Sequence, residues 1–343
     1  MNGPRVSFLV VNHNGRDVLG ACLASIRGQR GVSFELLLVD NGSSDGSLQQ
    51  VTPRNNERIL RLGENLGFAE GNNRAFAEAR GEFVALVNND ATLAPDWAWH
   101  LVEALLTHPE AGAAAGRTLQ HDDPERLDSA GFEFFSCVSC TSYQGLAAEH
   151  FRHRAHRPFG AAASAALYRR SAIEASGLFH PEFFCFYEDT DLALRLLLHG
   201  FDTVYVDAAV AWHRGSHTAK RHSPFHTYHL RRNSEFVYWI NMQGRLALLH
   251  LPYHLVHEWL STASAATRGQ LPEALRAKRD ALRALPWIVH QRHELRRKLE
   301  RAGPLSAAQA RLSAKMTRGF PYRTHARQAA RSAWARLFGR NAD

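Results

Sequence analysis

The segment Asn88–Asp90 places two amides and a carboxylate directly after an apolar stretch, Phe83–Val87. A short apolar run rich in valine is typical of a buried parallel strand. In open α/β sheets, ligands bind beyond the carboxyl ends of the strands, and carboxylate and amide oxygens are suitable ligands for a divalent cation. The segment therefore predicts a cation site. Simple turn formation ahead of Pro95 is the alternative interpretation.

Other polar groups follow predicted strands in the same way. They are Asn12–Gly15, Asp40–Asp45, Glu188–Asp191 and His213. One such cluster is commonplace, but several at one edge of a sheet make a binding site. His213 fits a second metal ligand beside Asp90. A packed histidine next to Trp212 is the competing interpretation.

Phosphate-binding loops of the usual kinds are absent, because the sequence contains neither GxxxxGK[ST] nor GxGxxG. A phosphate-bearing ligand would therefore need a metal ion. A nucleotidyltransferase is an alternative on a similar sheet. It would require a basic, glycine-rich loop near the first strand, and Asn12–Gly15 does not supply one.

The polar clusters are positioned by strands that alternate with helices, which predicts a doubly wound parallel sheet. The expected strands cover residues 6–11, 34–39, 59–62, 83–87, 165–168, 203–206 and 210–213. The expected helices cover residues 16–29, 72–80 closed by Gly81, 96–108, 170–176, and a stretch that ends at Gly200. Residues 65–71 are expected to form a loop, and residues 112–161 show no clear periodicity.

Composition fits a globular protein, since 45% of the 343 residues are hydrophobic and 22% are charged. No run of 18 apolar residues occurs, and the first residues do not resemble a signal peptide. We therefore expect a cytoplasmic protein. The four cysteines include one CxxC pair, Cys137 and Cys140. We interpret that pair as structural, because a zinc or redox role would need a second ligand pair or a thioredoxin-like context.

Charge is distributed unevenly along the chain. From Phe225 onward there are 21 Lys and Arg against 7 Asp and Glu, whereas the preceding part holds 20 and 26. Leu249, Tyr253, Val256 and Leu260 share one helical face in this basic region. Three interpretations remain open for it: a solvated helical surface, a nucleic-acid-binding surface without a recognised module, or docking on an anionic membrane leaflet.

Five motifs, taken together and in order, resemble the family 2 glycosyltransferases, and most of all their bacterial rhamnosyltransferase-like branch. They are VVNHNG (10–15), VDNGSSDG (39–46), NLGFAEGNN (65–73), LVNND (86–90) and FYEDTDLALR (186–195). The resemblance spans about Val6 to His217. It implies a GT-A fold, which is an α/β fold with a doubly wound mixed sheet and here a mainly α-helical C-terminal appendage. It also implies an inverting transfer from a nucleotide-diphospho-sugar.

The resemblance implies roles in donor binding for several residues. Asp40 matches the aspartate that recognises the base, while Asn12 and the turn at Asp45 match the lining of the nucleoside pocket. The loop passing near the diphosphate and sugar is matched by Asn65, Gly71 and Asn72.

The resemblance also implies the chemistry at the sugar. Asn88, Asn89 and Asp90 stand where the family has its DXD motif, with an amide in place of the first carboxylate, so Asp90 is the expected metal ligand. His213 matches a histidine that completes the metal site. Asp189 matches the general base that deprotonates the acceptor hydroxyl. Glu188 is expected to orient the site, and Asp191 to favour the N-terminal end of the following helix.

These expectations divide the chain into regions and assign its substrates and cofactor. Residues 1–225 form a GT-A domain, with a nucleotide-sugar-binding half (1–110) and an acceptor-binding half (111–225). Residues 226–343 form a basic, mainly helical region that associates with the inner face of the cell membrane. The donor is a dTDP- or UDP-sugar, with rhamnose favoured, the acceptor is a polyprenyl-diphosphate-linked saccharide or growing glycan, and the cofactor is Mg²⁺ or Mn²⁺. The alternative is a non-catalytic nucleotide-sugar-binding or scaffold protein of the same fold.

Overall fold

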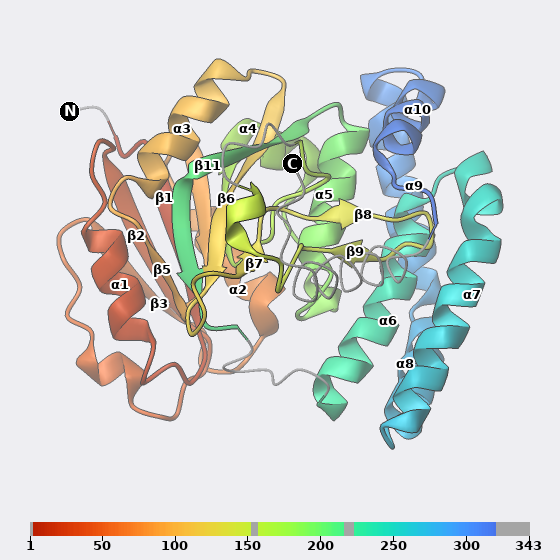
Figure 1. Cartoon of the computed structure of the whole chain (residues 1–343), viewed down its shortest axis with the longest axis horizontal. Helices are drawn as coiled ribbons and strands as arrows, with labels where there is room; N and C mark the ends of the chain where they lie inside the picture. The colour runs from red at the N-terminus through yellow and green to blue at the C-terminus, as the bar shows by residue number, and fades with distance from the viewer. Residues whose placement is uncertain (1–2, 152–156, 216–222, 320–343) are drawn as a thin grey trace, which may run out of the picture.

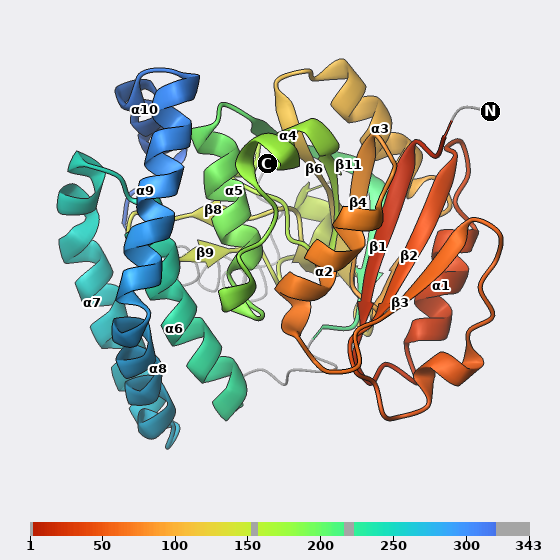
Figure 2. The same ribbon diagram turned by 180° about the vertical axis from the view of Figure 1, so that it is seen from behind.

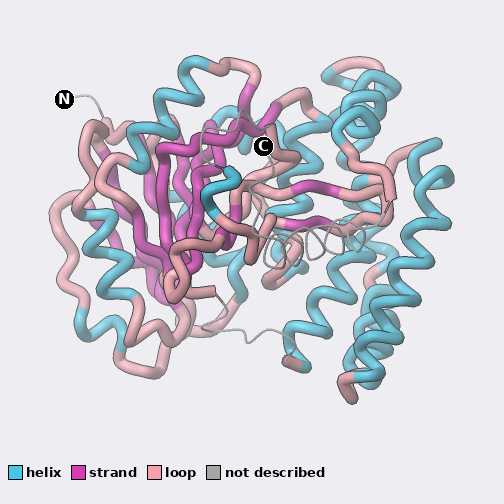
Figure 3. Tube along the Cα trace, viewed as in Figure 1, coloured by secondary structure: helices cyan, strands magenta, loops and turns pink. Residues whose placement is uncertain are grey.

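The computed structural model describes residues 3–151, 157–215 and 223–319, and it consists of a mixed β-sheet with helices on both faces and a block of helices at one side (Figure 1; Figure 3). The strands are β1 (Val6–Asn12), β2 (Phe34–Asp40), β3 (Glu57–Arg61), β4 (Phe83–Val87), β5 (Ala91–Leu93), β6 (Ala111–Gln120), β7 (Leu127–Ser129), β8 (Glu133–Phe134), β9 (Cys140–Thr141), β10 (Ala165–Arg169) and β11 (Asp202–His213). The helices are α1 (Leu19–Arg27), α2 (Gly67–Glu78), α3 (Trp97–Thr107), α4 (Arg170–Ser176), α5 (Glu188–Leu198), α6 (Pro224–Asn241), α7 (Arg245–Thr267), α8 (Leu271–Arg283), α9 (Leu285–Ala302) and α10 (Leu305–Lys315).

The main sheet has the strand order β3-β2-β1-β4-β10-β6-β11-β5, with β7 added beside β6. Strands β1 to β4 pair with one another in parallel. The orientation changes at β10, which is antiparallel to both β4 and β6. The predicted α/β fold with a mixed, doubly wound sheet and a helical C-terminal region is confirmed.

Apolar side chains cover both faces of the sheet, as expected for parallel strands buried on two sides. Along β1, Val6, Phe8 and Val10 pack with α1 and α3, whereas Leu9 and Val11 pack with α2, α4 and α5. This alternation follows from the two-residue period of a strand. Figure 2 shows α2 on the face opposite α1. The strands that lead to the polar clusters are therefore held by packing on both faces.

The C-terminal helices α6 to α10 form their own layer beyond α5. Residues of β8, α5 and α6–α10 share one buried cluster that includes Phe134, Leu194, Phe236 and Leu312. Figure 1 shows these helices at the side of the molecule away from α1. The helical layer is thus packed directly on the part of the chain that carries Glu188 and Asp189.

Most predicted elements are confirmed, but three boundaries are wrong. Helix α2 begins at Gly67 rather than residue 72, because buried Asn41 accepts the Leu66 N–H and Asn65 accepts the Gly67 N–H, so side chains satisfy that helix end. Gly81 does not close the helix, which ends at Glu78. A Cβ at Gly81 would lie 2.6 Å from the Ser7 nitrogen, so this glycine serves close backbone packing.

Strand β11 is the third difference, because the two predicted strands at 203–206 and 210–213 form one strand with an irregularity between Val206 and Val210. Its partner β6 was not predicted at all. Small residues dominate β6, and a Cβ at Gly116 would lie 2.3 Å from the carbonyl oxygen of Ala209. Close packing selected small side chains here, and such residues give little strand signal.

Candidate active site

Asn12 connects the ends of three strands at the rim of the sheet. Its amide nitrogen donates to the hydroxyls of Ser43 and Ser47 at 3.1 and 2.9 Å, and its oxygen accepts from Asn89 at 2.8 Å. Asn12 is completely buried. Because β1, β2 and β4 are parallel neighbours, the polar groups after them converge as the sequence predicted.

The turn after β2 is shaped by its two carboxylates. Asp40 accepts the Ser43 N–H at 3.1 Å, and Asp45 accepts the N–H groups of Arg16 and Ser47 at 2.8 and 3.0 Å. Slight burial opposes ionisation of Asp45, but these hydrogen bonds outweigh it and lower its pKa. Asp45 therefore holds its negative charge while it fixes the turn.

The motif around α2 contributes a polar helix start and a buried helix body. The amide of Asn41 donates to the side chain of Asn65 at 3.0 Å. Gly71 packs on Val11, whose Cγ1 would lie 2.8 Å from a Cβ there, and Asn72 is buried and bonded to the Phe68 carbonyl. The structure thus places Asn65 at the helix start, and Gly71 and Asn72 within packed surroundings.

The ends of β4 and β11 bring Asp90 and His213 together. Strands β5 and β11 pair with His213 opposite Ala91, so Asp90 lies one residue from the pairing. The Nε2 of His213 lies 3.1 Å from Asp90 Oδ1 and 3.2 Å from Asn88 Nδ2. In the described ranges, no group of three His, Cys, Asp or Glu side chains is arranged to hold a metal ion. What the site offers is one carboxylate facing one imidazole.

Asp128 of β7 orients this histidine, and no pattern in the sequence indicates this role. Its Oδ2 lies 2.8 Å from His213 Nδ1, while its Oδ1 accepts from Gln144 at 2.8 Å. Burial alone lowers the pKa of His213, but hydrogen bonds to Asp128 and Asp90 raise that pKa to about 10. The ring therefore carries a proton on Nε2 that is directed at Asp90, and a cation bound there would have to displace that proton. The carboxylate behind Nδ1 is the usual partner of a metal-binding histidine.

Asp189 lies at the start of α5, behind a strained loop and not after a strand, so the predicted strand before Glu188 is wrong. Phe184, Phe186 and Tyr187 all have positive φ angles, between 63° and 68°. Such angles cost about 1–3 kcal/mol each for residues other than glycine and occur preferentially at functional sites. The buried amide of Asn233 in α6 fastens the loop, because it lies within 2.8–2.9 Å of the carbonyls of Phe183, Cys185 and Phe186.

Asp189 and Asn88 are linked through one short backbone segment. The Ala163 N–H donates to Asp189 Oδ2 at 3.4 Å, and the next residue, Ser164, accepts the Asn88 N–H at 2.9 Å. Asp189 also accepts the Thr190 N–H at 2.7 Å. The structure therefore brings Asp189 to the same rim as the β4 end, although about a hundred residues separate the two in the chain.

Glu188 and Asp189 form an acidic pair in which Glu188 is buried and Asp189 is partly buried. Burial raises the pKa of both carboxyls, and the charge of Asp189 raises that of Glu188 further. Hydrogen bonds from Ala163 and Thr190 work in the opposite direction for Asp189. Glu188 has a buried oxygen, Oε2, without a hydrogen-bond partner in the described residues. Glu188 is therefore the carboxyl that holds a proton more readily.

We expect Glu188→Gln to stabilise the protein at alkaline pH. When the pKa of a carboxyl is higher in the folded than in the unfolded protein, the folded protein loses stability as pH rises from the unfolded-state pKa through the folded-state pKa. An amide does not titrate, so the variant lacks this loss. The free energy of unfolding should rise by about 1–3 kcal/mol at about pH 8 and change little at about pH 4. Urea unfolding at both pH values checks this, and equal pH slopes for the two proteins would contradict it.

Asp191 lies in the protein interior, away from the rim of the sheet, and its contacts are with other parts of the fold. It is fully buried, its Oδ2 pairs with Arg195 at 2.8 Å, and its Oδ1 accepts from Asn241 of α6 at 2.7 Å. Arg195 also donates to the carbonyls of Ser176, Gly177 and Leu178. Asp191 does lie in the first turn of α5, as expected. Its contacts show that it also joins α5 to the helical layer.

The CxxC pair lies in a packed region. Both thiols are free, Cys137 is buried, and burial raises the pKa of Cys137 and of Cys140 to about 12. Thiols that hold their protons so firmly are poor nucleophiles and poor metal ligands.

Comparisons with known proteins agree with this arrangement. The profile of the family described as "Glycosyl transferase family 2" matches residues 7–177. The chain is 31% identical over 231 residues to an N-acetylglucosaminyl-diphospho-decaprenol L-rhamnosyltransferase of Mycobacterium tuberculosis, covering 59% of this chain and 73% of that protein. It is 31% identical to the uncharacterized protein y4gI of Sinorhizobium fredii over 62% of this chain. The matched region spans less than two thirds of the length of several relatives. It covers 25% of the length of y4gI and 29% of the length of the putative glycosyltransferase EpsH of Bacillus subtilis.

Solved structures share the fold. The mannosyltransferase PcManGT from Pyrobaculum calidifontis, in complex with GDP-Man and Mn²⁺, is 20% identical with a TM-score of 0.53, over 87% of this chain and 86% of that one. S. aureus TarS 1-349 in complex with UDP-GlcNAc is 17% identical with a TM-score of 0.55, over 91% and 92% of the two chains. The GT-A expectation is thus confirmed at the level of the fold. Together with the family profile and the mycobacterial relative, the order of motifs along the sheet shows that this chain belongs to glycosyltransferase family 2.

Proposed function

We propose that the protein is an inverting glycosyltransferase that uses Asp189 as its general base. The observation that carries the proposal is the Ala163–Ser164 segment, which bonds Asp189 on one side and Asn88 on the other. A carboxylate next to the donor end of the sheet can accept the acceptor hydroxyl's proton as that oxygen attacks the anomeric carbon. Inversion needs no covalent intermediate, so one base is sufficient. Burial supports the role, since it raises the pKa of Asp189 and makes it a stronger base.

Asp90 and His213 are the residues that would hold a divalent cation, and their chemistry fits one. A carboxylate oxygen suits either Mn²⁺ or Mg²⁺, and an imidazole oriented by a carboxylate favours Mn²⁺ over the harder Mg²⁺. Bound there, the cation would supply neutralisation of the charge on the leaving nucleoside diphosphate. GalNAc-T7 and PcManGT, which share the fold, have structures with Mn²⁺. Asn88 and Asn89 contribute uncharged neighbours to this site.

The remaining rim residues form the donor site in this proposal. Asp40 recognises the base, and Asn12 and Asp45 shape the nucleoside pocket. Asn65 orders the start of α2, while Gly71 and Asn72 act through packing. The donor is a dTDP- or UDP-sugar, with dTDP-rhamnose favoured by the mycobacterial rhamnosyltransferase. UDP-GlcNAc on TarS supports a uracil nucleotide as the other choice.

The acceptor in this proposal is a polyprenyl-diphosphate-linked saccharide, and the process is synthesis of a cell-surface polysaccharide. The name of the mycobacterial relative describes a lipid-linked acceptor, and another relative is a succinoglycan biosynthesis protein of Rhizobium meliloti. With a lipid-linked acceptor, the enzyme would act at the inner face of the membrane. Within the described residues, no helix has the length and apolar character needed to span a bilayer.

A thermal-shift screen of nucleotide sugars with Mn²⁺ or Mg²⁺ tests the donor site. A ligand at about 100 times its Kd stabilises the folded protein by roughly 2.7 kcal/mol. We expect dTDP- or UDP-sugars to raise the melting temperature and Asp40→Ala to remove the increase. An equal increase in the Asp40→Ala variant, or none with any dTDP- or UDP-sugar, would contradict the proposal.

We expect Asp128→Asn to weaken Mn²⁺ binding by about 10–100-fold, the usual effect of removing a carboxylate behind a metal-binding histidine. Calorimetric titration with Mn²⁺ measures this directly. Asp123→Asn is the matched control, because Asp123 is an exposed carboxylate of the same region that pairs with Arg126 instead. Equal affinities in the two variants would show that Asp128 does not act on His213.

A further inference from the structure

Helix α7 exposes its apolar side chains and buries its polar ones. Its buried positions include four residues that are polar or charged, His250, His254, His257 and Glu258. By contrast, Leu248, Leu255 and Trp259 are 76%, 57% and 69% exposed. A surface helix of a globular protein normally has the opposite arrangement. The face predicted from Leu249, Tyr253, Val256 and Leu260 therefore exists, and it points outward.

The buried polar side chains fix this orientation of α7. Glu258 accepts from Ser234 at 2.7 Å and pairs with Lys278 of α8. His254 Nε2 lies 3.0 Å from Glu235 Oε2, and its ring stacks on Tyr238 with centroids 4.0 Å apart. A rotation that buried the leucines would break these contacts. The outward apolar face is therefore a property of the fold.

The exposed apolar surface continues from α7 onto α8, and we name it the α7–α8 face. Its exposed large apolar residues are Leu248, Leu249, Tyr253, Leu255, Val256, Trp259, Leu260, Leu271, Leu275 and Leu282. Figures 1 and 2 show α7 and α8 at the edge of the molecule farthest from α1. An exposed apolar patch of this extent marks an interaction surface.

The net charge around the α7–α8 face is positive, although Arg279 and Arg283 both pair with Asp280, at 3.1 and 3.2 Å. Between Arg245 and Val289 the exposed residues include the five arginines 245, 268, 276, 279 and 283. None of the three acidic residues of this stretch is exposed: Glu258 is buried, and Glu273 and Asp280 are partly buried. A surface that combines leucine and tryptophan with arginine fits the headgroup region of an anionic bilayer.

The positive charge of the α7–α8 face disfavours contact with another positively charged surface. A second copy of the chain docked face to face would bring its arginines against those of the first. The segment 320–343 lies outside the described residues, and its sequence carries five arginines and one aspartate, so it is also of the wrong sign to cover this surface.

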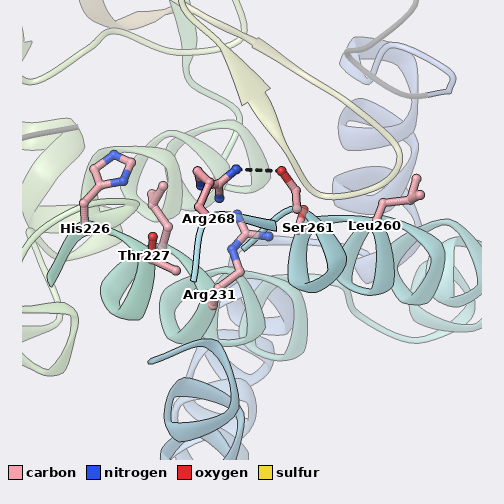
Figure 4. Close-up of a pocket in the computed structure, with 8 residues that line it drawn as sticks. His226, Thr227, Arg231, Leu260, Ser261 and Arg268 are labelled. Carbon is pink, nitrogen blue, oxygen red and sulfur yellow. Dashed lines mark hydrogen bonds between the residues drawn. The ribbon is translucent and has the colours of Figure 1, made fainter. Parts of the chain in front are cut away.

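A pocket at the end of α7 adds positive charge beside this face (Figure 4). Its volume is about 460 Å³, and it lies between α6 and α7, lined by Arg231, Leu260 and Arg268, among others. Arg231 Nη1 is buried without a hydrogen-bond partner in the described residues, and lies 3.7 Å from Glu258. His226, which also lines the pocket, has its ring 5.0 Å from that of Phe186 in the strained loop before Asp189.

We propose that the α7–α8 face lies on an anionic phospholipid bilayer, with a lipid phosphate in the pocket between α6 and α7. This names the surface by which the enzyme proposed above reaches a lipid-linked acceptor, and to that extent it rests on the proposed function. The ring contact between His226 and Phe186 connects the pocket to the loop that carries Asp189. The bilayer would therefore lie on the acceptor side of the site.

Flotation of the full chain with vesicles tests the proposal. We expect binding to vesicles of phosphatidylcholine with phosphatidylglycerol, and much weaker binding to phosphatidylcholine alone. Leu255→Ser with Trp259→Ser should lower the partition coefficient by about a hundredfold or more, since two exposed apolar side chains lose their burial in lipid. Arg245→Gln with Arg268→Gln should lower it about 25-fold, roughly fivefold for each arginine near an anionic leaflet.

Matched controls keep the result specific. Trp99→Ser removes an exposed tryptophan from α3, and Arg30→Gln with Arg80→Gln removes two exposed arginines from the sheet half; both should float like the wild type. The positions are exposed, so the variants should keep the wild-type melting temperature. Asp90→Asn, expected to impair metal and donor binding, should also float normally, so the docking surface and the catalytic proposal can fail separately.

Three outcomes would overturn the proposal. The first is wild-type flotation by the Leu255/Trp259 variant, and the second is no flotation of the wild type with anionic vesicles. The third is a stable dimer in sedimentation that becomes a monomer in the Leu255/Trp259 variant, since a second copy would then cover the face.

Discussion

Asp189→Asn is expected to reduce sugar transfer by about 10²–10⁴-fold, the usual contribution of a general base. The amide has nearly the same shape and can still accept the Thr190 N–H through its oxygen, so the loop and α5 should remain in place. It cannot accept the proton of the attacking hydroxyl. Turnover with donor, acceptor membranes and Mn²⁺ gives the first measurement, and titration with the nucleoside diphosphate gives the second.

Nucleotide affinity should be unchanged in this variant, because Asp189 lies outside the cluster formed by Asn12, Asp40 and Asp45. Glu182→Gln, at an exposed carboxylate a few residues earlier, is the control and should keep full turnover. Wild-type transfer by Asp189→Asn would remove Asp189 from the mechanism. Nucleotide binding without transfer in the wild type itself would instead favour the non-catalytic alternative.

Arg195→Met should lower the free energy of unfolding by about 3–5 kcal/mol, because it leaves the charge of Asp191 buried without its partner. Asp191 and Arg195 are both buried, and Arg195 also satisfies three carbonyls after α4. Methionine fills similar space but donates no hydrogen bond. Urea unfolding followed by circular dichroism measures the change.

The double variant Asp191→Asn with Arg195→Met is the informative control for the stability prediction. Removal of both charges should recover part of the loss, since the remaining penalty is then confined to unpaired carbonyls. Arg74→Met, which breaks the exposed pair with Glu70, should cost less than about 1 kcal/mol. A cost of that size for Arg195→Met would show that the buried pair does not hold α5.

The strands that carry the site could be predicted from sequence because their local signal is strong. In β1, β2 and β4 an apolar run ends abruptly at an amide or a carboxylate, and parallel topology then brings those ends together. Strand β6 could not be predicted, because tight packing at Gly112 and Gly116 selected small residues that resemble a loop. Tertiary packing, which no local pattern reports, decided that element.

The candidate site was likewise predictable only where a local pattern in the sequence marks a residue. Asp90 and His213 were identified because they lie at or just after strand ends. Asp189 was also identified, but it follows the Phe184–Tyr187 loop and not the strand that the sequence predicted. Asp128 and Asn233 were not identified as site residues, because their importance comes from contacts with residues 85 and about 50 positions away. The roles assigned to the site residues and the division of the chain at residue 225 stay predictions.

The attachment of Asn233 to the Phe183–Phe186 backbone has a consequence for protein engineering. All side chains assigned to chemistry precede residue 225, so that position would seem a natural junction for a chimaera with another glycosyltransferase. Such a hybrid would leave behind the amide that holds three aromatic residues at positive φ. The crossover point should instead follow Asn241, so that α6 is inherited together with the loop it restrains.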